Sequence, residues 1–331
     1  MALQIFSRKP VEPKVKPRAP KARPVEPEVY MPADRLELHS DPLHQAAQLE
    51  RFGHLIVNRN EFKDHPDVDK VCLAACERID DIFGIVPEGF VSLPKTISDE
   101  PGAEEETIET EAFFLAKHCV TNAQFQKFVE AGGYEQLDLW PKEIWPHLID
   151  FKDQSDLPAP RFWRHARPHK KYMDHPVVGI CQFEAAAYAM WAGFRLPTEA
   201  EWQMAATWRI RSVANTLRRY PWGDALDIGR CNIWASSHGH TVPVGEYPTG
   251  AAPNGVAQLI GNVWEWTSSD FDVTDHEGSP VVGDMIMATI RGGAFDTYFP
   301  MQATSVFRTG LVSLARPHNV GFRLAWNLRG N

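Results

Sequence analysis

The sequence predicts the α+β fold class, with a short helical region ahead of a larger domain that has little regular secondary structure. Apolar residues recur with helical spacing in several segments before about residue 220. After that point Gly, Pro and Asn stand close together between short apolar runs, which is typical of turns. Strand-like and helical segments do not alternate regularly, so a parallel sheet built from βαβ units is not expected.

The first segment, residues 1–33, is rich in Pro and Lys, with prolines at positions 10, 13, 17, 20, 24, 27 and 32. Proline at this density disfavours both helix and sheet and favours an extended chain. We expect a disordered or extended arm that docks along a protein partner.

A helical region is expected over residues 34–85. Asp64 and Pro66 are typical of a helix start, and they precede a run of apolar side chains three or four residues apart. These side chains are Val68, Val71, Cys72, Ala75 and Ile79. The region is too small to be an independent domain, so we expect it to pack on the domain that follows.

The main domain is expected over residues 86–327. A strand is predicted near 89–97, and a helix is predicted to start at Thr121 or Asn122. A second helix is expected over 183–193, which ends in glycine. Thr198 and Glu201 have the spacing of a capping box and indicate a third helix.

Composition excludes several classes of function. The formal net charge of −9 gives no support for nucleic-acid binding. No apolar run approaches the roughly 18 residues of a membrane span, and the N-terminus lacks the apolar stretch of a secretion signal. The five cysteines, at 72, 76, 119, 181 and 231, are scattered and odd in number, which suits reduced thiols. We therefore expect a cytoplasmic protein.

Several motifs, taken in order, resemble the formylglycine-generating-enzyme (sulfatase-modifying factor) family. They include RLPTEAEW at 195–202, CNIW at 231–234, GNVWEWT at 261–267, RGGAF at 291–295 and NVGFRLAW at 319–326. The resemblance covers residues 86–327. It implies a compact fold related to C-type lectins, with little regular secondary structure and often with bound calcium.

One activity in this family is the copper-dependent oxidation of a sulfatase cysteine to formylglycine, which uses two cysteines after the RGG segment. The matching positions in this sequence hold Thr297 and Gln302, and no cysteine follows Cys231. Copper(I) prefers sulfur ligands, which a hydroxyl and an amide do not supply. Formylglycine generation by this route is therefore not expected.

A second activity that the resemblance implies is the non-haem-iron chemistry of the ergothioneine-type sulfoxide synthases. These relatives carry an H-x-x-x-H-x-E motif in an added helical domain. The N-terminal region of this chain has four histidines, none with that spacing: His39, His44, His54 and His65. The iron motif is therefore absent.

Other histidines remain as alternative ligands for iron or copper. His165 and His169 are separated by three residues, but Pro168 prevents them from sharing a helix face. His238 and His240 would point to the same side of a strand, and His175 is a further candidate.

The resemblance also implies calcium and ligand sites. We expect calcium at Asn232 and Ile233 and at Asn254 and Gly255, although the loop after the first pair lacks an acidic ligand. A polar or peptide-like ligand is expected on the face where relatives bind theirs. The residues predicted to line that face are Asp296, Tyr298, Gln302, Arg308 and His318.

These observations leave two interpretations. The first is a binding, accessory or assembly subunit, a pseudoenzyme that keeps the fold and has lost the metal chemistry. It depends on the missing copper cysteines, the missing iron motif and the Pro/Lys-rich arm. The alternative is an oxygen-dependent oxidoreductase that binds non-haem iron, or another metal, through a different set of ligands.

Overall fold

The computed structural model describes residues 29–94, 105–208, 218–271 and 286–327. The described residues from Met31 onward form one compact unit, to which Val29 and Tyr30 do not belong. Most of the predicted Pro/Lys-rich arm, residues 1–28, lies outside the described residues. The elements below all belong to the unit that begins at Met31.

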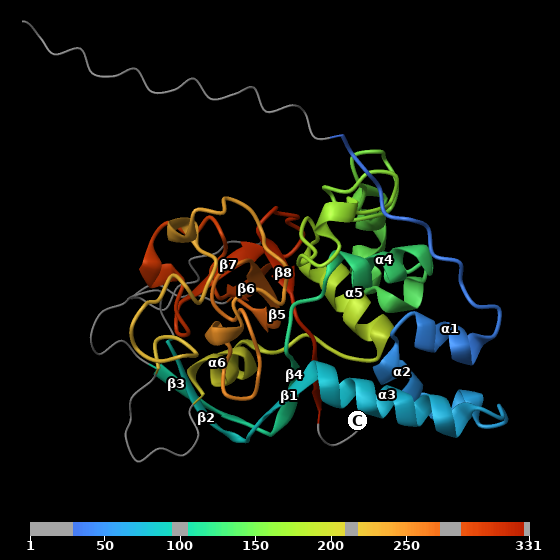
Figure 1. Ribbon diagram of the computed structural model, residues 1–331, viewed down its shortest axis with the longest axis horizontal. Coiled ribbons are helices and arrows are strands. Elements are labelled where there is room, and N and C mark those ends of the chain that lie inside the picture. Colours follow the sequence, from blue (N-terminus) through green and yellow to red (C-terminus); the bar gives the residue numbers. More distant parts are fainter. Residues whose placement is uncertain (1–28, 95–104, 209–217, 272–285, 328–331) are drawn as a thin grey trace, which may run out of the picture. The chain divides into compact units, whose positions relative to one another are not determined.

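Four helical segments open this unit, and Figure 1 shows them together at one side of it. They are α1 (Pro42–Gln48), α2 (Phe52–Val57), the 3-10 helix η1 (Arg59–Phe62) and α3 (Val68–Ile82). Helix α1 begins where the Asp41 side chain accepts a hydrogen bond from the His44 amide, and proline fills its first turn. In α3 the buried residues are Val68, Cys72, Ala75 and Ile79, which confirms the predicted apolar spacing.

Three further α-helices carry the main motifs of the sequence. They are α4 (Asn122–Glu130), α5 (Gln182–Ala192) and α6 (Glu199–Thr207). Thr121 caps α4, and Thr198 with Glu201 forms the predicted capping box of α6. Helix α5 ends at Gly193, whose φ of +82° is the left-handed conformation that glycine adopts without strain.

The strands form three small sheets. The first has the order β1 (Phe83–Val86), β4 (Phe113–Ala116) and β9 (Ala325–Asn327), and the second pairs β2 (Gly89–Pro94) with β3 (Glu105–Thr110). The third has the order β7 (Arg308–Val312), β6 (Met287–Arg291), β5 (Trp264–Asp270) and β8 (Val320–Phe322). Only the β5–β8 pair is parallel among these described strands. The architecture is therefore the predicted α+β class.

Long irregular segments connect these elements. Six more 3-10 helices interrupt them: η2 (Leu137–Leu139), η3 (Lys142–Asp150), η4 (Lys170–Tyr172), η5 (Trp234–Ser236), η6 (Pro248–Gly250) and η7 (Pro300–Gln302). One large apolar core runs from the N-terminal helices through α4 and α5 to the sheet of β5 and β6. Within the described residues, no helix combines the length and the apolarity that crossing a membrane requires.

A buried ion pair fixes the centre of the fold. The guanidinium of Arg323 donates to both carboxylate oxygens of Glu265, at 2.6 and 2.7 Å, and both side chains are fully buried. Glu265 also accepts a hydrogen bond from the indole N–H of Trp202 at 2.9 Å. The motifs RLPTEAEW, GNVWEWT and NVGFRLAW thus meet in one polar network, because each buried charge needs partners.

Candidate metal centre and ligand face

Three side chains at the N-terminal helices form a possible metal site. Asp41, His44 and His65 each offer one ligand atom, and these atoms lie within 4.8 Å of one another. All three side chains are partly exposed. In the part of the chain that the structure describes, this is the one such group of three or more His, Cys, Asp or Glu side chains.

Local structure positions each of these residues. Asp41 caps α1, so its Oδ1 atom accepts from the His44 amide at 3.0 Å. His65 lies between η1 and α3, and its Nε2 atom is 3.2 Å from Asp41 Oδ2. Both interactions favour the charged form of Asp41, and the hydrogen bond from the His44 amide contributes most to lowering the pKa of this carboxyl.

Two neighbours hold the histidines in place. The Asp67 amide donates to Nδ1 of His65 at 3.1 Å, and Oδ2 of Asp67 lies 3.4 Å from Nε2 of His44. On the other side, the ring of His39 lies 5.2 Å from that of His44, and its Nδ1 atom accepts from the Asp41 amide. Such outer contacts orient the ligands of a metal.

The donor set fits a divalent transition metal. Two imidazoles and one carboxylate are the ligands that non-haem Fe(II) oxygenases use, and they leave coordination positions open. A metal bound at Nε2 of His65 would move the ring proton to Nδ1 and displace the hydrogen bond from Asp67. That loss costs about 1 kcal/mol, which is small beside typical metal-binding energies.

Sequence reasoning missed this group. The expected iron motif has histidines at a fixed helical spacing. In the structure, the α2–η1 connection instead brings His65 back to the start of α1. The one available signal was Asp41 with His44 at a helix start, which is an ordinary capping pattern.

The predicted ligand face is partly assembled, on the loops between β6 and β8. His318 Nε2 lies 3.3 Å from Asp296 Oδ2, and the Asn319 amide donates to both carboxylate oxygens of Asp296 at 3.1 Å. Tyr298 follows Asp296 and is 65% exposed. Arg308 does not join this group, because its guanidinium lies 2.9 Å from Glu199 in the interior.

Exposed apolar side chains border these polar residues. The indole of Trp234 lies 6.1 Å from the ring of Tyr298, and the ring of Phe299 lies 5.2 Å from that of Tyr298. We call Trp234, Tyr298, Phe299 and Met301 the aromatic face; each is more than half exposed. Gln302, in η7, is only partly exposed beside it.

Comparison with known proteins identifies the family. The Sulfatase-modifying factor enzyme 1-like domain matches residues 77–328, which is more than half of the chain. The chain belongs to this family. The structure of PvdO from Pseudomonas aeruginosa has the same fold, with a TM-score of 0.51 at 19% identity over 74% of this chain and 94% of that chain.

Two curated relatives indicate which activities occur among similar sequences. A hercynine oxygenase from Mycobacterium tuberculosis is 34% identical over 67% of this chain and 54% of its own length. A formylglycine-generating enzyme from Streptomyces coelicolor is 34% identical over 66% of this chain and 79% of its own length. The chain therefore spans about half of the hercynine oxygenase and most of the formylglycine-generating enzyme.

These matches overturn the first functional interpretation. The prediction of a binding, accessory or assembly subunit was wrong, because the similar curated proteins include a hercynine oxygenase and a formylglycine-generating enzyme, both of which are named for a catalytic activity. The prediction failed because it treated the absence of the relatives' ligand motifs as the absence of any metal site. The alternative interpretation, an oxygen-dependent metal oxidoreductase, is the one that the comparisons support.

The two positions predicted to match the family's copper ligands have structural roles in this chain. The buried Thr297 hydroxyl accepts from the Ala294 amide at 2.8 Å, and its carbonyl accepts from the Trp234 amide at 3.3 Å. Gln302 lies at the end of η7, where its amide donates to the Phe299 carbonyl. Neither residue supplies the soft sulfur that Cu(I) prefers.

The two positions predicted for calcium differ. Asn232 is buried, and its Oδ1 atom has no hydrogen-bond partner among the described residues, whereas its amide nitrogen donates to the His240 carbonyl. At the second position, the side chain of Asn254 donates to the Ile85 carbonyl and accepts from the Val256 amide. Only Asn232 thus keeps an oxygen free for a cation.

The predicted histidine ligands do not converge. The rings of His238 and His240 lie 6.4 Å apart, and those of His175 and His240 lie 6.5 Å apart. His165 lies in the tight turn closed by the Arg164–Arg167 bridge, whereas His169 caps η4, so the two do not share a helix face. No three of these five histidines bring ligand atoms within 4.8 Å of one another.

Proposed function

We propose that this protein is an oxygen-dependent metal oxidoreductase whose metal is bound by Asp41, His44 and His65. The single observation that carries the proposal is the convergence of these two imidazoles and one carboxylate at the start of α1. The similarity to hercynine oxygenase, which covers about half of that enzyme, supports oxygen chemistry in a chain without the copper cysteines.

A divalent iron in this site would supply a centre that binds and reduces oxygen. The chain's own residues prepare the site. Asp41 contributes negative charge and is fixed by its capping role, and the Asp67 carboxylate lies 3.4 Å from Nε2 of His44. Because the group is only partly buried, a substrate can reach it from solvent.

The ligand face is a separate proposal. Figure 1 shows α1 and α3 well removed from the sheet that contains β6, β7 and β8. We propose that Asp296, Tyr298 and His318, with Trp234 beside them, take a polar or peptide-like ligand. The exposed aromatic rings and the adjacent carboxylate support such contacts. The residues near the metal centre would therefore act on a substrate bound at the α1–α3 end.

The experiment is a metal titration of the purified full chain under anaerobic conditions. Co(II) absorption and elemental analysis after Fe(II) loading report binding, and an oxygen electrode reports uptake. We expect one metal per chain, and we expect His44→Ala and His65→Ala each to weaken binding at least about 10-fold and to abolish oxygen uptake.

The matched control is the double variant His238→Ala/His240→Ala, which removes two exposed imidazoles elsewhere. It should bind metal and consume oxygen like the wild type. Loss of metal in this control, with retention in the His44 and His65 variants, would show that the centre is misassigned. If wild type and all variants bind iron, copper and cobalt equally weakly, the oxidoreductase proposal fails.

A further inference from the structure

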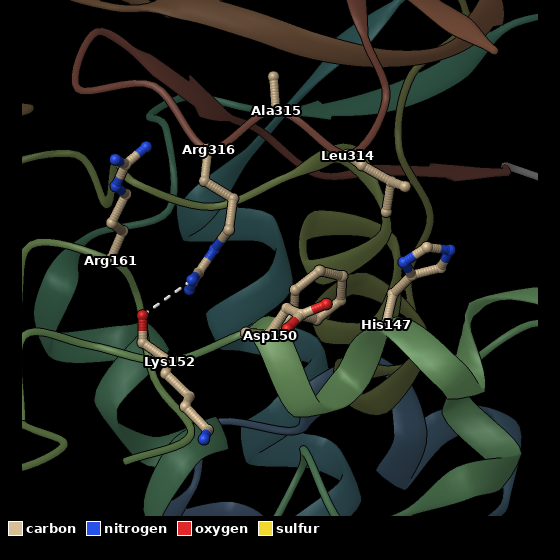
Figure 2. Close-up of a pocket in the computed structure, with 8 residues that line it drawn as sticks. His147, Asp150, Lys152, Arg161, Leu314, Ala315 and Arg316 are labelled. Atoms are coloured by element: carbon tan, nitrogen blue, oxygen red, sulfur yellow. Dashed lines mark hydrogen bonds between the residues drawn. The ribbon is translucent and has the colours of Figure 1, made fainter. Parts of the chain in front are cut away.

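A further pocket, which shares no lining residue with either of these sites, has a charge pattern of its own. It lies between η3, the segment after it and the turn after β7, and its volume is about 410 Å³. The lining residues are His147, Asp150, Phe151, Lys152, Arg161, Leu314, Ala315 and Arg316. Figure 2 shows these side chains around a shared space, with Lys152 directed away from the others.

One wall is built around a preorganised guanidinium. The side chain of Arg316 is 8% exposed, and it donates to both oxygens of Glu184 and to the carbonyls of Lys152 and Ala159. These bonds use four of its five N–H groups, and the remaining one, on Nη1, has no partner among the described residues. The guanidinium also packs on the ring of Phe151, at 5.5 Å.

The position of the Arg316 guanidinium is fixed by the buried contacts of its partner Glu184. Glu184 is fully buried, and it also accepts from the hydroxyl of Tyr134 at 2.5 Å and from the amide of Cys181 at 2.8 Å. A buried charge network of this kind holds its members in one geometry. Arg316 is therefore held at a defined position in the pocket wall.

Charges of opposite sign flank the apolar centre of the pocket. Arg161 and Asp150 are both exposed, and neither forms an ion pair with a described residue. Figure 2 shows Arg161 on the same side as Arg316, and the Asp150 carboxylate between Arg316 and His147. Leu314 and the ring of Phe151 supply apolar surface between these groups.

We infer that this pocket binds a small zwitterion of the α-amino-acid type, a molecule with a carboxylate and a cationic amine beside an apolar body. The carboxylate would accept from Arg161 and from the free N–H of Arg316, because guanidinium groups match carboxylate geometry. The amine would lie against Asp150. A pocket of this volume lies within the size range of small-molecule sites.

The test uses three probes of matched shape: phenylalanine, 3-phenylpropanoate and phenethylamine. Phenylalanine carries both charges, whereas the other two carry one each. Calorimetric titration of the metal-free protein should show binding of phenylalanine at least about 10-fold tighter than either analogue, since each charged hydrogen bond contributes that much.

Two variants test separately the contribution of each charge to the preference for phenylalanine. Arg161→Gln should reduce the affinity for phenylalanine to about that for phenethylamine, and Asp150→Asn should reduce it to about that for 3-phenylpropanoate. Lys63→Gln, an exposed cation outside the pocket, is the charge-matched control and should bind like the wild type. Equal affinity for all three probes, no measurable binding, or an unchanged Arg161→Gln variant would overturn the inference.

This inference is independent of the metal centre. The metal-free protein is used throughout, and His44→Ala should bind phenylalanine like the wild type. A failed metal titration with normal phenylalanine binding would therefore contradict only the oxidoreductase proposal, and the reverse result would contradict only the pocket.

Discussion

His65 Nε2 lies 3.2 Å from Asp41 Oδ2, although α1, α2 and η1 separate the two residues in the sequence. This contact joins a helix cap to a loop and creates the donor set of the proposed metal centre. Asp41 thereby has two roles, one in stabilising α1 and one in binding metal, and two substitutions can separate them.

Asp41→Asn keeps a side-chain oxygen that can cap α1, whereas Asp41→Ala removes the cap. In metal-free protein we expect Asp41→Asn to change the free energy of unfolding by less than about 0.5 kcal/mol, and Asp41→Ala to lower it by about 1 kcal/mol. Both should weaken Co(II) binding, because neither supplies a carboxylate. Urea unfolding and Co(II) titration measure the two effects, and wild-type Co(II) affinity in Asp41→Asn would exclude Asp41 as a ligand.

The buried pair of Arg323 and Glu265 should be the most sensitive polar contact. Arg323→Met leaves the Glu265 carboxylate buried without its main partner, so the free energy of unfolding should fall by about 3–5 kcal/mol. Arg78→Ala, which removes an exposed pair with Asp81, should cost less than about 1 kcal/mol. Urea titrations compare the two variants, and similar losses in both would show that burial does not set the cost.

Stability should depend on pH through His175. Burial, followed by the charge of His240, lowers the pKa of His175 from 6.5 to about 4. Between these values the unfolded chain binds a proton that the folded protein does not, so stability falls as the pH drops from about 6.5 to about 4.

His175→Asn removes this titrating group and can still bond to the Thr241 hydroxyl, which lies 2.9 Å from His175 Nδ1. Relative to the variant, the wild type should lose about 1–2 kcal/mol across that pH range. Urea unfolding at several pH values provides the measurement. Parallel pH profiles for the two proteins would show that His175 does not titrate as expected.

Gly193, at the end of α5, packs closely against the backbone of α2 at Gly53 and His54. A Cβ atom added there would lie 1.9 Å from the backbone nitrogen of His54, and its φ of +82° adds strain for any other residue. Gly239 has a similar φ of +68° but open space around it. Gly239→Ala should therefore cost about 1–2 kcal/mol, and Gly193→Ala about 1–3 kcal/mol more. Equal costs in thermal or urea unfolding would mean that α2 moves away from α5 easily.

Calcium binding is a further prediction, based on the free Oδ1 atom of Asn232. Calcium at about 100 times its Kd would add about 2.7 kcal/mol to the free energy of unfolding, which corresponds to a Tm increase of several degrees. Asn254→Ala should keep this increase, because the Asn254 side chain is already bonded to Ile85 and Val256. Asn232→Ala should lose it. Thermal unfolding with calcium or magnesium decides, and an equal effect of magnesium would argue against a calcium site.

Much of the fold could be predicted because its signals are local. The apolar spacing around Cys72, the cap at Thr121 and the capping box at Thr198 each depend on residues within a few positions of one another. The Pro/Lys-rich arm could not be compared with the structure, since residues 1–28 lie outside the described part. The domain boundaries at 33 and 85 stay predictions.

The site was harder to predict because its parts are remote in the sequence. Arg308 was expected beside Asp296 and His318, but its guanidinium forms an ion pair with Glu199 in the interior. A buried carboxylate needs a cationic partner, and the sequence does not show which arginine will provide it. Trp234 lies beside Tyr298 in the aromatic face, although no sequence pattern connects these two residues.

The sequence by itself determined the family, the α+β class and the absence of the copper cysteines, because these depend on motifs and residue types along the chain. Only the tertiary structure decided which titratable groups meet. Asp41, His44 and His65 converge because α2 and η1 return the chain to the start of α1. Arg316 and Arg161 share a pocket because the turn after β7 packs beside the segment after η3. Such convergence follows from packing between distant segments, and no local pattern of residues encodes it.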